Sequence, residues 1–186
     1  MSTYPIWQEL CADFSDDPSL FRAVLAALES PASYLADNED RLADRGIDSA
    51  SEVSPWLAFL DWLEANRLMT ELDRRAGADD LEWSLSQLVS VRERPVDLSL
   101  LSDSGAHFLK LLPVAEEALN EHGLAIVFLG ADWDGYPVAV ASVDRVPRIT
   151  ELAAELGESI TAAGDLPAER ELERAAVTAR PWWKLW

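Results

Sequence analysis

The sequence predicts an α+β fold, in which helices pack on a small, mostly antiparallel sheet with a C-terminal β-hairpin. Two observations predict this class. Apolar residues recur at helical spacing through the first third of the chain, and two apolar runs, 124–129 and 136–141, flank a short turn. The chain has 186 residues, of which 49% are apolar. A chain of this length buries a sufficient core without a disulfide or a metal ion.

The N-terminal third is predicted to form short helices. Pro18, Pro31 and Pro55 each follow an Asp or a Ser, and both residue types cap helices whose first turn tolerates proline. The helix that begins at Pro55 is apolar on nearly all sides, so we expect it to be central. The first helix presents one apolar face made of Ile6, Trp7, Leu10, Cys11 and Phe14.

The middle of the chain mixes both patterns. Residues 68–72 are a short apolar-leaning run that is compatible with a strand, and residues 95–101 alternate as a half-buried strand does. A helix is expected after Asp79-Asp80. Another helix is expected to begin at Ser104-Gly105, with Pro113 either kinking it or marking a later start.

The last third contains the clearest unit. The runs 124–129 and 136–141 are predicted as paired strands, and Gly135 in the turn between them is expected to adopt a positive φ. A helix that ends at Gly157 follows. We therefore expect one domain over residues 1–164, and over residues 165–186 a charged helical arm with a Trp-rich tail.

Composition excludes several functions. The chain carries 34 Asp and Glu against 15 Lys and Arg, a net charge of −19, so direct nucleic-acid binding and docking on anionic lipid are not expected. No apolar run approaches the roughly 20 residues of a spanning helix, and residues 1–10 do not resemble a secretory signal. Cys11 is the single cysteine, so the sequence predicts no disulfide and no multi-cysteine zinc site. A cytoplasmic protein is expected.

Catalytic patterns are weak. Asp103, Ser104 and His107 lie close in sequence, but triad partners come from separate elements, so we interpret Ser104 as a helix cap and His107 as a surface residue. Asp132 and Asp134 resemble the start of a calcium loop, but the remaining ligands of such a loop are absent, so we interpret these residues as a polar hairpin turn. The sequence therefore predicts no catalytic residue, no metal site and no cofactor.

Acids and tryptophans are the remaining candidates. Residues 1–61 hold 12 Asp or Glu against three arginines, a density that favours either solubility or attraction of a cationic protein. Trp133 lies at the hairpin tip, and three tryptophans end the chain. Trp133 either packs on the sheet or is offered to a partner. The three terminal tryptophans are expected to dock in a groove of the domain, between two chains or at a membrane interface. The candidate partner-binding residues are Asp13, Asp16, Asp17, Asp37, Glu39, Asp40, Asp132, Trp133, Asp134, Trp182, Trp183 and Trp186.

The chain also resembles a bacterial family whose function is unknown, over about residues 5–160. The resemblance lies in the hairpin, in the helix 151–157 and in the segments Pro55–Leu57 with Asp61 and Leu63, Glu71–Asp73 and Asp80–Leu88. It implies an intracellular bacterial α+β domain and carries no activity or catalytic residue with it.

These observations favour a non-enzymatic acidic protein-binding module. Its most specific form is an immunity-like or inhibitor-like protein that neutralises a basic partner. Two alternatives stay open. One is a metal-dependent or small-molecule enzyme that uses carboxylates, which would require a cleft where acids converge. The other is a homo-oligomeric structural protein that associates through its Trp-rich tail.

Overall fold

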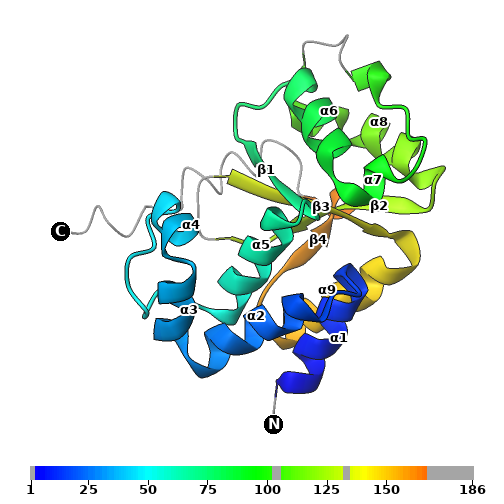
Figure 1. Cartoon of the computed structure of the whole chain (residues 1–186). Coiled ribbons are helices and arrows are strands. Elements are labelled where there is room, and N and C mark those ends of the chain that lie inside the picture. Colours follow the sequence, from blue (N-terminus) through cyan, green and yellow to red (C-terminus); the bar gives the residue numbers. More distant parts are fainter. Residues whose placement is uncertain (1–2, 102–105, 132–134, 167–186) are drawn as a thin grey trace.

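The computed structural model describes residues 3–101, 106–131 and 135–166. Four strands form one sheet in the order β1-β3-β2-β4, and every neighbouring pair is antiparallel (Figure 1). The strands are β1 (Met69–Asp73), β2 (Leu124–Leu129), β3 (Gly135–Ser142) and β4 (Ile160–Ala162). The helices are α1 (Tyr4–Phe14), α2 (Pro18–Glu29), α3 (Pro31–Asp37), α4 (Glu39–Asp44), α5 (Pro55–Ala65), α6 (Ala78–Gln87), α7 (Val89–Arg92), α8 (Phe108–Asn120) and α9 (Val146–Glu155), with short 3₁₀ turns η1 (Ser99–Leu101), η2 (Val143–Arg145) and η3 (Ala163–Asp165).

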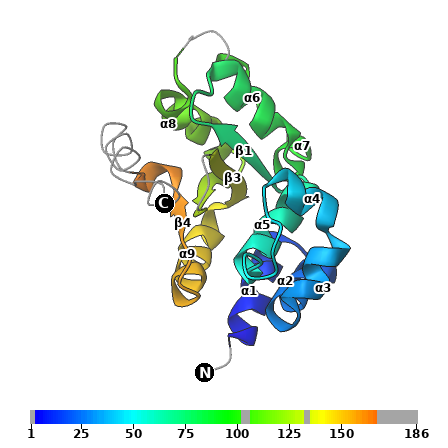
Figure 2. The same ribbon diagram turned by 90° about the vertical axis from the view of Figure 1, so that its left-hand side faces the viewer.

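Helices cover both faces of the sheet. Helices α1, α2, α5 and α9 pack on one face, and α6, α7 and α8 pack on the other (Figure 2). Alternate residues of a strand point to opposite faces, so Met69 and Val127 join the first core and Leu72 and Ile126 join the second. All residues of β2 are buried. The predicted α+β class is confirmed, and burial on both faces explains why the hairpin strands are apolar throughout.

The hairpin is confirmed with a precise register. Val127 pairs with Ala139 and Leu124 pairs with Ser142. The expected positive φ at Gly135 is wrong, because the positive-φ glycines in the described residues are elsewhere in the chain. Gly135 instead makes room for Glu71 on the neighbouring strand, whose carboxylate occupies the space where a Cβ would lie. The absence of a side chain is therefore needed for packing and not for backbone conformation.

The predicted caps Asp17, Ser30 and Ser54 precede helix starts, whereas Asp79 and Asp80 lie in the first turn of α6, whose N-cap is Gly77. Asp17 accepts a hydrogen bond from the Ser19 backbone N–H at 2.8 Å, and Ser54 accepts one from that of Leu57 at 3.0 Å. Helix α8 begins at Phe108 and not at Ser104. The imidazole of His107 is its cap and accepts from the Leu109 N–H at 3.3 Å. The interpretation of His107 as a plain surface residue is therefore corrected, because its ring completes the helix end.

One predicted strand is confirmed, one is absent, and one observed strand was not predicted. The run 68–72 is confirmed as β1, which spans Met69–Asp73. The run 95–101 is not a strand: Leu98 enters the core from a loop, and Leu101 enters it from the turn η1. Strand β4 was not predicted, since its three residues are too few for a period to show. The division at residue 164 stays a prediction, and residues 167–186 lie outside the described structure.

Helix α5 is central, as predicted. On the sheet face that it shares with α1, α2 and α9, this helix buries Trp56, Phe59, Leu60 and Leu63. The rings of Trp56 and Phe59 stack at a centroid distance of 5.2 Å. The indole N–H of Trp56 donates to the Gly130 carbonyl at 2.6 Å and so fixes the helix to the end of β2. Within the described ranges, no helix is long and apolar enough to cross a membrane.

Candidate functional site

The structure separates the candidate acids into an inward and an outward group. Asp13 points inward: its side chain is 6% exposed, and its Oδ1 lies 3.2 Å from Nη1 of Arg145 on η2. Burial raises the pKa of Asp13. Asp16, Asp17, Asp37, Glu39 and Asp40 are all exposed. Asp13 therefore does not belong to the surface that the sequence assigned to it, because it lies where α1 packs against the α9 region.

Asp16 and Asp17 occupy the turn between α1 and α2. Asp17 has a structural role as the cap of α2, and the hydrogen bonds from Ser19 lower the pKa of its carboxyl. Asp16 has no hydrogen bond or ion pair with any described residue. This turn therefore presents negative charge to solvent while it also fixes the start of a helix.

The other three acids surround a shallow open depression between α3 and α4. It has a volume of about 340 Å³, and we call it the acidic concavity; its lining residues are Ala36, Asp37, Asn38, Glu39, Asp40 and Arg41. None of its three carboxylates forms an ion pair or a hydrogen bond with another residue of the described chain. The concavity thus combines exposed negative charge with a hollowed surface.

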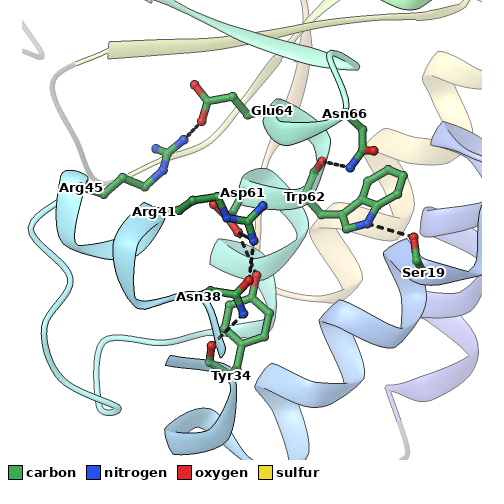
Figure 3. A network of polar contacts seen from close by, with 9 residues as sticks. All are labelled: Ser19, Tyr34, Asn38, Arg41, Arg45, Asp61, Trp62, Glu64 and Asn66. Atoms are coloured by element: carbon green, nitrogen blue, oxygen red, sulfur yellow. Dashed lines mark hydrogen bonds and ion pairs between the residues drawn. The ribbon is translucent and has the colours of Figure 1, made fainter. Parts of the chain in front are cut away.

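A buried carboxylate beneath this surface connects α3, α4 and α5. Asp61 of α5 is 3% exposed. The Tyr34 hydroxyl donates to its Oδ2 at 3.0 Å, and Nη2 of Arg41 lies 2.9 Å from the same oxygen. Asn38 accepts a hydrogen bond from the Arg41 guanidinium and donates to the Tyr34 carbonyl at 2.7 Å (Figure 3). These four residues are named the Asp61 network.

The Asp61 network gives the concavity a fixed base. Burial, and secondarily the negative charge of Asp61, raise the pKa of Tyr34, so its hydroxyl stays a donor at neutral pH. Arg41, whose side chain is 47% exposed, bends from the rim of the concavity toward Asp61. Its positive charge is therefore directed toward the buried carboxylate, and the exposed acids of the concavity stay without a partner in the described chain.

A second set of ion pairs extends from this corner to the sheet. Arg45, which follows α4, pairs with Glu64 of α5, and its Nη1 lies 3.7 Å from Oε2 of Glu71 on β1. Figure 3 shows Arg45 and Glu64 beside the Asp61 network, with Trp62 on the other side of α5 donating to Ser19. Two of the three arginines in residues 1–61 are therefore held by acids of α5 and β1.

The sequence analysis did not single out Asp61, Tyr34 or Arg41 as functional. A signal for Asp61 exists: it is the charged residue in the middle of the run Pro55–Leu63, which is otherwise apolar on nearly all sides. A charge on the buried side of a central helix requires a partner. Its partners, Tyr34 and Arg41, lie in other helices, so the sequence alone does not identify them.

The other candidates are placed as follows. Asp132, Trp133, Asp134, Trp182, Trp183 and Trp186 lie outside the described residues. The residues that the structure does describe hold no group of three or more His, Cys, Asp or Glu able to bind a metal ion. Burial raises the pKa of the Cys11 thiol to about 12. A thiol with such a pKa is a poor nucleophile, so Cys11 is not suited to thiol chemistry.

A family model, Domain of unknown function (DUF6630), matches residues 6–163. The chain belongs to this family. The match agrees with the resemblance inferred from the sequence over residues 5–160. Both the acidic concavity and the Asp61 network lie within the family domain. Neither a curated protein nor a solved structure matches the chain.

Proposed function

We propose that this protein is a non-enzymatic binding module whose acidic N-terminal region recognises a basic protein partner, as immunity or inhibitor proteins do. The acidic concavity is the observation that carries the proposal, because it joins a hollowed surface to three exposed carboxylates. In this proposal the protein acts in the cytoplasm of a bacterium, and Asp37, Glu39 and Asp40 are the first residues that the partner meets.

The distribution of ion pairs supports the proposal. Of the 12 acids in residues 1–61, Glu9, Asp13 and Asp61 form ion pairs with arginines, which leaves nine without an ion-pair partner in the described chain. Arg41 and Arg45 are held by the acids of α5 and β1. The fold thus uses most of the local positive charge internally, and the remaining negative field extends to solvent. Such a field increases the association rate with a cationic protein.

The test compares two triple variants with the same net charge. Asp37→Lys, Glu39→Lys and Asp40→Lys reverse the concavity, whereas Glu117→Lys, Glu121→Lys and Asp144→Lys reverse exposed acids of α8, the following turn and η2. Each variant, and the wild type, is immobilised and exposed to lysate of the native host at low and at high salt. Bound proteins are identified by mass spectrometry.

We expect one basic protein to bind the wild type and the control at low salt and to be lost from the concavity variant. Its association rate should then fall roughly tenfold or more for the concavity variant, with a flatter salt dependence. Equal losses in both triple variants would show that net charge alone drives the binding. An association rate that does not change with salt would contradict the electrostatic basis of the proposal.

A further inference from the structure

Strand β1 is one edge of the sheet, since among the described residues it pairs with β3 alone. Edge strands present backbone N–H and C=O groups on their free side, and another extended segment can pair with these groups. Which groups are free follows from the register, in which Glu71 is opposite Pro137 and Leu72 is opposite Tyr136.

Pro137 decides the direction of these groups. Directly opposed residues in an antiparallel pair alternate between those that exchange two hydrogen bonds and those that exchange none. Proline has no N–H, so Glu71 and Pro137 cannot be an exchanging pair. Glu71 therefore directs its N–H and C=O away from β3, and so do Met69 and Asp73, two residues away in each direction. The Asp73 carbonyl agrees with this assignment, because it accepts from the Ala76 N–H at 3.0 Å instead of pairing with β3.

The outward groups have no partner in the described part of the chain. Nothing within residues 3–101, 106–131 and 135–166 bonds to the N–H of Met69, Glu71 or Asp73, or to the carbonyls of Met69 and Glu71. Glu71 and Asp73 are exposed. Met69 is 2% exposed, so the accessible groups on the free side of β1 are the N–H and C=O of Glu71 and the N–H of Asp73.

Charge indicates what can pair there. Glu71 and Asp73 are on the same face of β1. Arg45 contacts both Glu71 and Glu64, so Glu64 lies near Glu71. Two copies of β1 paired antiparallel in full register would place Glu71 opposite Glu71, which disfavours self-association. An extended segment with Lys or Arg opposite Glu71 and Asp73 would be favoured for the same reason.

We propose that the free edge of β1 binds an extended, lysine- or arginine-bearing segment of the basic partner, which adds a fifth strand to the sheet. This inference rests on the proposed function for the nature of the partner. The backbone of Glu71 and Asp73 forms the hydrogen bonds, and the two carboxylates select the cationic side chains. The acidic concavity lies on the neighbouring corner, to which Arg45 connects β1.

The test uses the full-length ¹⁵N-labelled chain and two peptides of equal charge. The first peptide is a heptapeptide of alternating lysine and valine. The second is the same peptide Nα-methylated at each lysine, which retains the charge and removes the N–H groups that would pair with Glu71. Amide hydrogen exchange and NMR shifts are recorded with each peptide. We expect the unmodified peptide to slow exchange at Glu71 and Asp73 by roughly tenfold and the methylated peptide to leave it unchanged.

Two variants test the charge selection. Glu71→Lys should weaken binding of the unmodified peptide about tenfold, a change of about 1.4 kcal/mol, through like-charge repulsion. Asp79→Lys makes the same charge change on α6 and should leave binding within about twofold of the wild type. Circular dichroism verifies that both variants fold.

Three results would overturn the inference. Equal binding of both peptides would show attraction by charge without strand pairing, and the proposed function would survive. Protection of the Glu71 and Asp73 amides in the chain without peptide would show that the edge is already covered, by another segment of the chain in a monomer or by a second copy in a dimer. No binding of either peptide, with the host partner still captured through the concavity, would also refute the edge while leaving the proposed function intact.

Discussion

Two corners of this molecule bury a carboxylate, and they do so differently. At the α3–α4–α5 corner, Asp61 accepts a hydrogen bond from the Tyr34 hydroxyl of α3 and forms an ion pair with Arg41 of α4. At the α1–α9 corner, Asp13 has Arg145 near one oxygen, whereas its buried Oδ2 has no hydrogen-bond partner in the described structure. Arg145 is 62% exposed and therefore compensates the buried charge less.

The difference shows that burial of an acid does not by itself stabilise a fold. A buried charge is compensated only when its oxygens meet donors that are fixed in place. Asp61 has this environment and joins three helices beneath the acidic concavity. Asp13 lacks part of it, and burial correspondingly raises its pKa. The four predictions below test this contrast, from the largest expected effect to the smallest.

Asp61→Ala should be the most destabilising of these changes. It leaves the Tyr34 hydroxyl and the Arg41 guanidinium without their common acceptor and creates a small cavity, so we expect a loss of about 3 kcal/mol in the free energy of unfolding. Denaturant unfolding monitored by tryptophan fluorescence measures it. Asp40→Ala, an exposed acid of the concavity, serves as the control and should change stability by less than about 0.5 kcal/mol. If Asp61→Ala lost less than about 1 kcal/mol and could not be distinguished from Asp40→Ala, the Asp61 network would not stabilise the fold as we propose.

Tyr34→Phe should cost about 1 kcal/mol, because it removes one buried hydrogen bond and retains the ring. Combined with Asp61→Asn, it should show coupling, with a double-variant effect different from the sum of the two single effects by at least about 0.5 kcal/mol. Strict additivity in the same unfolding experiment would show that the two side chains act independently.

Asp13→Asn should have a smaller effect of opposite sign at neutral pH. The pKa of the Asp13 carboxyl is higher in the folded protein than in the unfolded chain, so the folded protein binds the carboxyl proton more tightly. The wild type therefore loses stability as pH rises from about 3.8 through the higher folded pKa. The variant lacks that loss. We expect it to match or exceed the wild type at pH 7, by less than about 1 kcal/mol, and to lose this advantage at pH 3. Urea unfolding at both pH values checks the sign, and a variant clearly less stable than the wild type at pH 7 would reverse the interpretation.

Neutralising the concavity should have the smallest effect on folding. The variant with Asp37→Asn, Glu39→Gln and Asp40→Asn removes three exposed charges that have no partners in the described chain, so we expect a change within about 0.5 kcal/mol. Thermal unfolding at low and high salt measures it. A large loss of stability would mean that these acids support the fold and would weaken their assignment to partner binding.

The sequence predicted much of the fold because its strongest signals are local. Apolar periodicity and Pro-preceding caps identified α2 and α5, and two apolar runs identified β2 and β3. The prediction of a strand at 95–101 was wrong. Leu98 and Leu101 reach the core from a loop and a 3₁₀ turn, and the resulting alternation of apolar and polar residues resembles that of a strand. The candidate site was predicted in part: Asp37, Glu39 and Asp40 line one concavity, whereas Asp13 turned inward.

By itself, the sequence determined that this is an acidic α+β protein with a central helix at Pro55 and a buried hairpin at 124–142. These properties follow from composition and from spacing within single elements. The tertiary structure decided which acids face solvent, which arginines they hold and which side of β1 is free. Those features depend on contacts between residues far apart in the chain, such as Tyr34 with Asp61 and Glu71 with Gly135, and local spacing carries no information about them.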